Sequence, residues 1–128
     1  MKYLLDTHTL LWGAYRTDRL SARIRRILGS SDPELFVSAA SAWEIATKFR
    51  LGRLPAAHIL ANDFVRTVTE AGYLLLAISV EHGLRAGRMV GEHKDPFDRM
   101  LAAQAIHEDM PILSSDEQLD SFGVRRIW

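Results

Sequence analysis

Short apolar runs of strand length alternate with longer amphipathic segments along the chain of 128 residues. Residues 2–5, 34–38, 73–79, 111–113 and 124–128 form these runs, and we predict each to be a strand. Strands that alternate with helices favour an α/β fold with a mostly parallel sheet, because each parallel return needs a crossover. We therefore predict a three-layer sandwich in which helices flank a central parallel sheet of about five strands.

The segments between the strands have the spacing, caps and glycine stops of helices. Ser21 opens one helix and Gly29 ends it, while Gly52 ends another and Pro55 prevents its continuation. We predict helices over residues 7–15, 21–29, 41–52, 56–71, 80–93, 96–109 and 114–122.

Composition limits the class of protein. Hydrophobic residues make up 48% of the chain and charged residues 25%, which is typical of a soluble globular protein. The length suits one domain over residues 1–128. No apolar run reaches the roughly 18 residues that cross a membrane, and the opening stretch is too short and too acidic for a signal peptide, so we expect a cytoplasmic protein. The absence of cysteine excludes disulfides, thiolate nucleophiles and zinc–thiolate sites.

Charges cancel in number but are unevenly distributed. Residues 1–60 hold nine Lys and Arg against five Asp and Glu, a net of +4, and residues 61–128 hold seven against eleven, a net of −4. The basic excess is concentrated on one predicted helix, at Arg16, Arg19, Arg23, Arg25 and Arg26. Such a stripe can bind phosphates, but a solvated helix face is the more common explanation.

Four acids stand where predicted strands end or the following helices begin: Asp6, Glu44, Asp98 and Asp116. In a parallel sheet these positions can meet at the edge where α/β folds bind ligands. Gathered carboxylates repel one another unless a divalent cation neutralises them, and oxygen ligands indicate Mg²⁺ or Mn²⁺. The pattern predicts a metal-dependent phosphodiester hydrolase.

Helix capping is an alternative explanation for three of these acids. Glu44 fits a capping box with Ser41, and Asp98 lies in a first helical turn, where an acid favours the helix dipole. Asp116 fits the cap of a short helix. Asp6 follows four buried-type residues and precedes no strong helix former, so a second role is expected for it.

Three further polar residues lie beside the acids: Thr7, Ser114 and His93. The two hydroxyls can orient a water or bind a phosphate oxygen, although hydrogen bonds within caps and turns are their default role. A loop histidine at position 93 is more often a surface residue than a catalytic one. No G-x-S-x-G motif is present, so nothing indicates a serine hydrolase.

Four stretches of the sequence resemble a known family. They are MKYLLDTHTLLW, SAASAWEIATKFRLGRL, KDPFDRMLAAQA and PILSSD, with FGVRRIW at the end. In this order and over this length they resemble the PIN-domain ribonucleases, and specifically the VapC toxins of type II toxin–antitoxin pairs. The resemblance implies a small parallel sheet flanked by helices and an endoribonuclease that depends on Mg²⁺ or Mn²⁺.

The resemblance also assigns residues. It places Asp6, Glu44, Asp98 and Asp116 in an acidic metal site, with Asp98 in the third position because it opens the stretch D-x-x-x-A-A. Asp95 is then an extra acid, expected to cap a helix rather than to bind metal. Ser114 occupies a place where many relatives carry threonine, which keeps the hydroxyl.

The family further implies three partners: an RNA substrate, a cognate antitoxin that inserts an apolar segment into a groove near the site, and a second copy in a homodimer. Candidates to line the groove are Trp12, Trp43, Phe49 and Leu51, although most aromatic residues pack in cores.

Other functions stay open. A metal-dependent DNA nuclease of related fold would use the same acids, and a binding module would use them only as helix caps. An Asp-phosphorylated receiver or phosphatase-like domain needs a second acid two residues after the strand-end aspartate, or a lysine after a late strand. Position 8 is histidine and PILSSD carries no lysine, so this class is disfavoured.

Overall fold

The computed structural model describes residues 1–128 and contains a five-stranded sheet in the order β3-β2-β1-β4-β5, in which every neighbouring pair is parallel. The predicted parallel α/β fold is confirmed. The strands are β1 (Lys2–Leu5), β2 (Glu34–Ser38), β3 (Leu74–Leu76), β4 (Ile112–Leu113) and β5 (Arg126–Ile127), so the last three are shorter than predicted.

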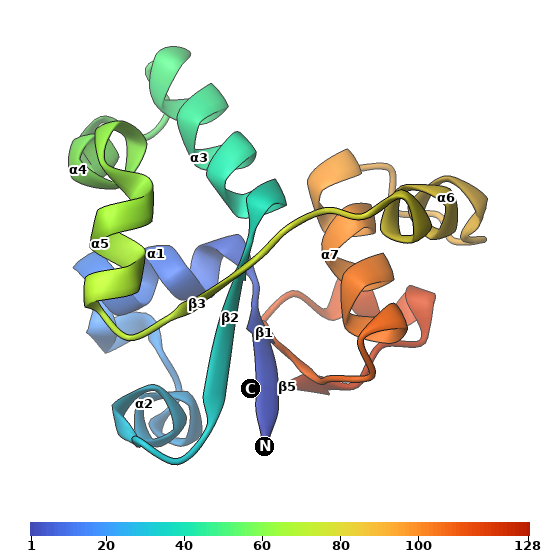
Figure 1. Cartoon of the computed structure of the whole chain (residues 1–128), viewed down its shortest axis with the longest axis horizontal. Coiled ribbons are helices and arrows are strands. Elements are labelled where there is room, and N and C mark those ends of the chain that lie inside the picture. Colours follow the sequence, from blue (N-terminus) through green and yellow to red (C-terminus); the bar gives the residue numbers. More distant parts are fainter.

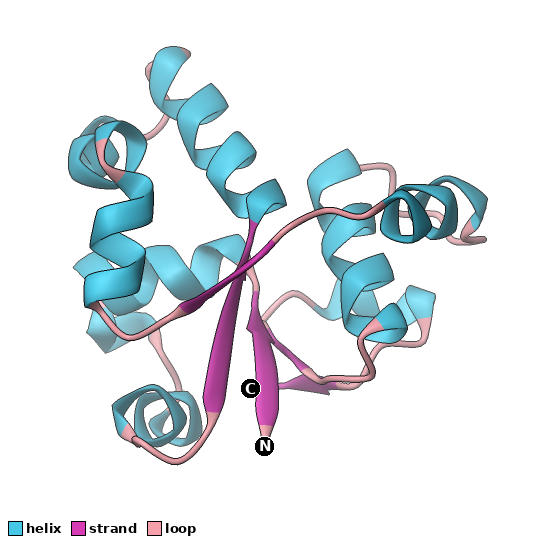
Figure 2. Cartoon of the chain, in the orientation of Figure 1, coloured by secondary structure: helices cyan, strands magenta, loops and turns pink.

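Seven α-helices and three short 3₁₀ helices connect the strands (Figures 1 and 2). The α-helices are α1 (Thr7–Tyr15), α2 (Ala22–Gly29), α3 (Ala39–Arg50), α4 (His58–Asn62), α5 (Phe64–Glu70), α6 (Val80–Arg88) and α7 (Pro96–His107). The 3₁₀ helices are η1 (Thr17–Arg19), η2 (Pro55–Ala57) and η3 (Glu117–Phe122).

Two helix predictions were wrong in extent. The single helix expected over residues 56–71 is divided into η2, α4 and α5, because the backbone at Asp63 (φ −141°) leaves the helical region. The helix expected over residues 80–93 ends at Arg88, and residues 89–95 form a loop.

The arginine stripe is also not continuous. Arg16 and Arg19 lie outside α2, at the end of α1 and in η1, while the other three arginines lie on α2. Arg16 is paired with Asp18. The five side chains therefore do not share one helix face.

Two layers of helices cover the two faces of the sheet. In Figure 1, α1, α2, α4 and α5 lie on one side of the strands, and α6 and α7 lie on the other. Neighbouring residues of β1 point to opposite faces, as the pleat requires: Leu5 joins the core beneath the first group, and Leu4 joins the core beneath α7 and η3. Both leucines are fully buried, so β1 is the centre of the molecule.

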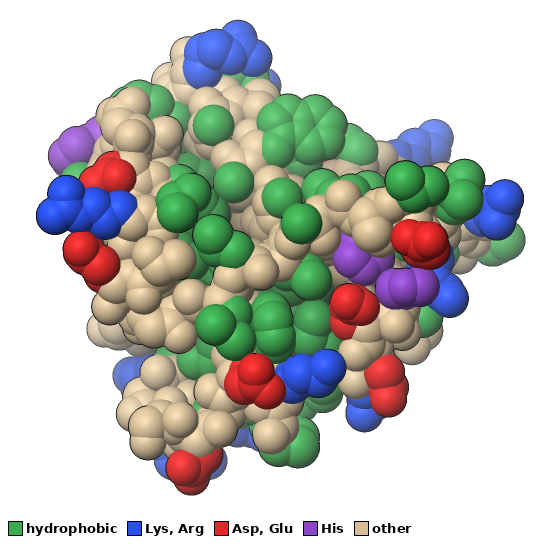
Figure 3. All heavy atoms as spheres, viewed as in Figure 1, with side chains coloured by type: hydrophobic (Ala, Val, Ile, Leu, Met, Phe, Trp, Pro, Cys, Tyr) green, Lys and Arg blue, Asp and Glu red, His purple; other side chains and the backbone are tan.

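Unlike the buried central strand β1, β3 lies at an edge of the sheet and is partly exposed. Leu74, Leu75 and Ile78 on and after this strand are each about 40% exposed. Figure 3 shows hydrophobic side chains gathered over the middle of the face that β3 crosses. None of the helices combines the length and the apolar composition that a bilayer-crossing segment requires.

The strand order determines where a ligand site is expected. From β1 the chain proceeds outward to β2 and β3, and it then crosses to β4 on the other side of β1. The order thus reverses at β1, and open parallel sheets bind ligands outside the carboxyl ends of the strands at such a point. Asp6 and Ser114 directly follow the two strands that meet there, β1 and β4.

Candidate functional site

Asp6 is the central acid of the candidate site. It follows β1, its side chain is 2% exposed, and its amide donates to the carbonyl of Leu113 on the neighbouring strand. Ser114 donates its hydroxyl to Asp6 Oδ2 over 2.6 Å and accepts from the Asp116 amide over 3.0 Å. Asp6 occupies the N-cap position of α1 but makes no capping bond, and its Oδ1 is buried without a partner.

Glu44 comes to the site from α3. The predicted capping box with Ser41 was wrong, because the helix begins three residues earlier and Ser38 caps it by accepting from the Ala40 amide. Ser41 instead lies inside the first turn, where its hydroxyl bonds the Thr7 hydroxyl over 2.9 Å. This bond joins the start of α1 to α3, one turn before Glu44.

Only one of the two carboxylate oxygens of Glu44 has a hydrogen-bond partner. Its Oε2 pairs with Lys48 Nζ over 2.5 Å, one helical turn further on. Its Oε1 is buried and has no hydrogen-bond partner. Since the side chain is only 4% exposed, water does not readily compensate that oxygen.

Asp98 and Asp95 have different roles at the start of α7. Asp95 is the N-cap, as predicted, and its Oδ1 accepts from the amides of Phe97 and Asp98. The Asp98 side chain bonds His93, with 2.6 Å between Oδ2 and Nε2. His93 was a possible supporting residue of the site, with a surface position as the more common alternative, and its side chain is only 16% exposed and bonds Asp98.

Arg99 explains why His93 lies there. Its guanidinium donates to the carbonyls of Ala86, Met89, Gly91 and His93, and it lies over the ring of Phe122 at 5.3 Å from the ring centre. One side chain therefore fixes the course of the loop over residues 89–95. The sequence carries no signal for this contact, because an arginine after an acid in a helix usually lies in solvent.

The acids act on one another electrostatically. Burial raises the pKa of Asp6 above its usual value, against the lowering effect of the Ser114 hydroxyl and the His8 charge, and the charge of Glu44 adds to the increase. Burial likewise raises the pKa of Asp98 to about 6, against the bond from His93, and the charges of Asp6, Asp95 and Glu44 raise it further. Burial, which disfavours the charged form of each carboxylate, is thus the main cause of both shifts, and the neighbouring acids add to it.

Asp116 completes the set of acids. It caps η3, as predicted, through a bond from the Gln118 amide to its Oδ1. Ligand atoms of Asp116, Asp98 and His93 all lie within 4.8 Å of one another. The structure therefore brings the four predicted acids to one end of the sheet, with Ser114 and His93 among them. Thr7 bonds Ser41, and Asp95 caps α7 through its Oδ1 alone.

Oxygen donors without partners fit a divalent cation. Asp6 Oδ1 and Glu44 Oε1 are two of only three buried side-chain polar atoms that lack a hydrogen bond. A carboxylate oxygen that is buried without a partner carries a large desolvation cost, which a bound cation removes. The donor set is rich in oxygen and contains no sulfur, as Mg²⁺ and Mn²⁺ require.

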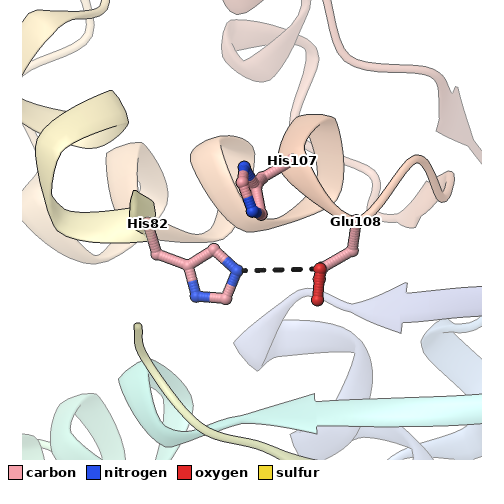
Figure 4. A group of neighbouring side chains, drawn as sticks. All are labelled: His82, His107 and Glu108. Carbon is pink, nitrogen blue, oxygen red and sulfur yellow. Dashed lines mark ion pairs between the residues drawn. The ribbon is translucent and has the colours of Figure 1, made fainter. Parts of the chain in front are cut away.

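A second group of potential ligands does not fit a metal. His82, His107 and Glu108 lie between α6 and α7, with His82 Nε2 at 3.9 Å from Glu108 Oε2 (Figure 4). His82 Nδ1 accepts from the Ser79 amide over 3.0 Å, so the neutral ring carries its proton on Nε2. That nitrogen therefore has no lone pair for a cation.

Comparisons with known proteins agree with this geometry. The PIN domain family model matches residues 3–124. One similar solved structure is VapBC2 from Rickettsia felis bound to a DNA fragment from its promoter, with a TM-score of 0.74 and 12% sequence identity over 99% of this chain and 98% of that chain. Another is DNA-bound VapBC from Salmonella typhimurium, with a TM-score of 0.69 and 18% identity over 99% of this chain and 97% of that chain. FitAcB from Neisseria gonorrhoeae is also similar, with a TM-score of 0.67 and 14% identity over 98% of this chain and 96% of that chain. No curated protein sequence matches the chain. At these identities the solved structures show the fold, and the family model shows that the chain belongs to the PIN-domain family.

Proposed function

We propose that this protein is a metal-dependent endoribonuclease, and that Asp6, Glu44, Asp98 and Asp116 hold Mg²⁺ or Mn²⁺. The observation that carries the proposal is the pair of buried carboxylate oxygens without partners, Asp6 Oδ1 and Glu44 Oε1. A protein that used these acids only as helix caps would satisfy them with backbone amides, as Asp95 and Asp116 are satisfied.

Each residue of the site has a separate task in this proposal. When bound, the ion lowers the pKa of water and offsets the charge that develops on a phosphodiester. Ser114 holds Asp6 Oδ2 and so keeps Oδ1 directed into the site. Lys48 holds Glu44 Oε2 in the same manner and leaves Oε1 available. The hydrogen bond between Thr7 and Ser41 keeps the helix that carries Glu44 beside the strand end that carries Asp6.

Substitution of Asp6 tests the proposal. We expect Asp6→Asn to abolish cleavage of a labelled RNA in the presence of Mn²⁺, because the carboxylate charge is lost. The far-ultraviolet circular dichroism should not change, because Asp6 makes no capping bond and an asparagine oxygen can still accept from Ser114. Asp32→Asn, which changes an exposed acid remote from the site, is the matched control and should cleave normally. Cleavage by Asp6→Asn at the wild-type rate would refute the proposal.

The substrate class needs its own comparison. RNA is favoured over DNA by the family resemblance and by the formal net charge of zero, which suits local recognition of a structured RNA rather than a grip on long duplexes. Matched single-stranded RNA and DNA of one sequence should be incubated with the protein and Mn²⁺. Cleavage of DNA but not of RNA would make the chain a DNA nuclease that uses the same acids.

We further propose that the enzyme is the toxin of a toxin–antitoxin pair. Of the predicted groove residues, Trp43 and Leu51 are 59% and 51% exposed and suit an apolar antitoxin segment. Trp43 directly precedes Glu44, and Leu51 follows the end of α3. Trp12 does not, because it packs edge-on against Trp128. A homodimer would cover the exposed leucines of β3.

Expression in cells tests the biological role. We expect induction of the wild-type chain to arrest growth and induction of Asp6→Asn not to do so. Co-expression of a small DNA-binding protein encoded directly upstream should restore growth. Sequencing of RNA ends after induction would identify the substrate, and light scattering of the purified chain would measure whether it is a dimer. Continued growth with abundant active wild-type protein would contradict the toxin role.

A further inference from the structure

His93 presents an imidazole to the two acids that enter the site from α7 and η3. Its Nε2 lies 2.6 Å from Asp98 Oδ2, and ligand atoms of His93, Asp98 and Asp116 fall within 4.8 Å of one another. The side chain is 16% exposed, so the ring is held against the acids rather than in solvent. A cavity of about 480 Å³ is lined in part by His93, Gln118 and Ser121.

The backbone that carries His93 is anchored independently of the acids. Arg99 donates to the His93 carbonyl over 3.2 Å and to three other carbonyls in or next to the same loop. Gly91 lies so close to Phe122 that a Cβ atom would approach the ring to 2.5 Å. The loop is thus packed in one course, and the imidazole reaches the acids without a rearrangement of the chain.

The ring nitrogen that faces the acids can become a metal ligand by a change of tautomer. His82, elsewhere in the structure, accepts a backbone hydrogen bond at Nδ1 and must therefore carry a proton on Nε2. Without a metal, His93 Nε2 carries the proton and donates it to Asp98 Oδ2 over 2.6 Å. No backbone amide donates to the His93 ring, so Nδ1 can take up that proton when a cation binds the Nε2 lone pair.

We infer that His93 is a ligand of the same metal, beyond the four carboxylates, and that it makes the site prefer Mn²⁺ to Mg²⁺. This inference rests on the proposed metal-dependent function. Imidazole is a ligand for transition metals, whereas Mg²⁺ favours oxygen donors and retains its water. A site with a nitrogen donor therefore discriminates between ions that an all-carboxylate site would bind more equally.

Electron spin-echo spectroscopy of the protein loaded with Mn²⁺ tests the inference without a measurement of activity. A directly bound imidazole gives a coupling of the ¹⁴N nucleus to the Mn²⁺ electron spin. We expect this coupling in the wild-type protein, its loss in His93→Gln, and its retention in His58→Gln, which changes an exposed histidine on another helix. Calorimetry should show Mn²⁺ binding weakened on the order of tenfold or more in His93→Gln, with a much smaller change for Mg²⁺.

The outcomes separate this inference from the proposed function. Binding of Mn²⁺ to the wild type without nitrogen coupling, or with coupling that survives in His93→Gln, would overturn the role of His93 and leave the carboxylate site intact. Equal weakening of Mn²⁺ and Mg²⁺ in His93→Gln would assign to His93 only the positioning of Asp98 and would also overturn the inference. Absence of any Mn²⁺ binding to the wild type would overturn both proposals.

Discussion

Replacement of Asp98 by asparagine should stabilise the metal-free protein at neutral pH while it removes the response to metal. The pKa of Asp98 is raised from 3.8 to about 6, chiefly by burial. Because the folded protein holds this proton more tightly than the unfolded chain, the free energy of unfolding falls as the pH rises from about 4 to about 6. The decline has an upper bound of about 3 kcal/mol, and access of solvent to the carboxyl reduces it to about half of that.

Urea unfolding in the presence of a chelator measures how much the ionisation of Asp98 lowers the free energy of unfolding. The asparagine side chain does not titrate, so the advantage of Asp98→Asn over the wild type should grow by about 1.5 to 3 kcal/mol between pH 4 and pH 7.5. Asp32→Asn, at an exposed position, should show no such growth. At pH 7.5, Mn²⁺ at about 100 times its dissociation constant should stabilise the wild type by about 2.7 kcal/mol and the Asp98→Asn variant much less.

Two results would refute this reasoning. If the difference between Asp98→Asn and the wild type is the same at both pH values, Asp98 is not the strained acid that its burial implies. If Mn²⁺ stabilises both proteins equally, Asp98 does not bind the ion. The opposite signs of the two expected effects exclude a general loss of folding as their common cause.

Further substitutions test the structural support of the site. Gly91→Ala should lower the free energy of unfolding by about 1 to 3 kcal/mol in urea titrations, because a Cβ atom would approach the Phe122 ring to 2.5 Å. Arg99→Lys cannot satisfy the four carbonyls and should cost about 2 to 4 kcal/mol, with faster hydrogen exchange over residues 89–95 than in the wild type. Ser21→Ala removes the cap of α2 and should lower stability by about 1 kcal/mol without a change in metal binding.

The sequence predicted the parts of the fold that depend on local pattern. The run KYLL is fully apolar after its first residue, has the length of a strand and ends in an acid, and it forms the central strand with Asp6 at its carboxyl end. The N-cap at Asp95 was also predictable, because Asp, Pro and a later acid fit the start of a helix. These features need no knowledge of distant residues.

Features that depend on tertiary contacts were not predictable. Serines at positions 38 and 41 both suit an N-cap, and only the end of β2 decides that Ser38 begins the helix and leaves Glu44 without a capping bond. The place of His93 depends on the carbonyls that Arg99 binds, which lie six to thirteen residues away along the chain. The break near Asp63 lies within a pattern that is helical on both sides.

The hydrogen bond between Ser114 and Asp6 joins residues 108 positions apart. During synthesis, a growing chain that has reached Pro111 already contains β1, β2 and β3 but lacks the strand that orients Asp6, as well as Asp116. A chain of this length therefore lacks one of the four acids of the proposed site and the hydroxyl that bonds another. If the four acids hold the metal as proposed, cleavage activity should therefore appear only after η3 has been added to the chain.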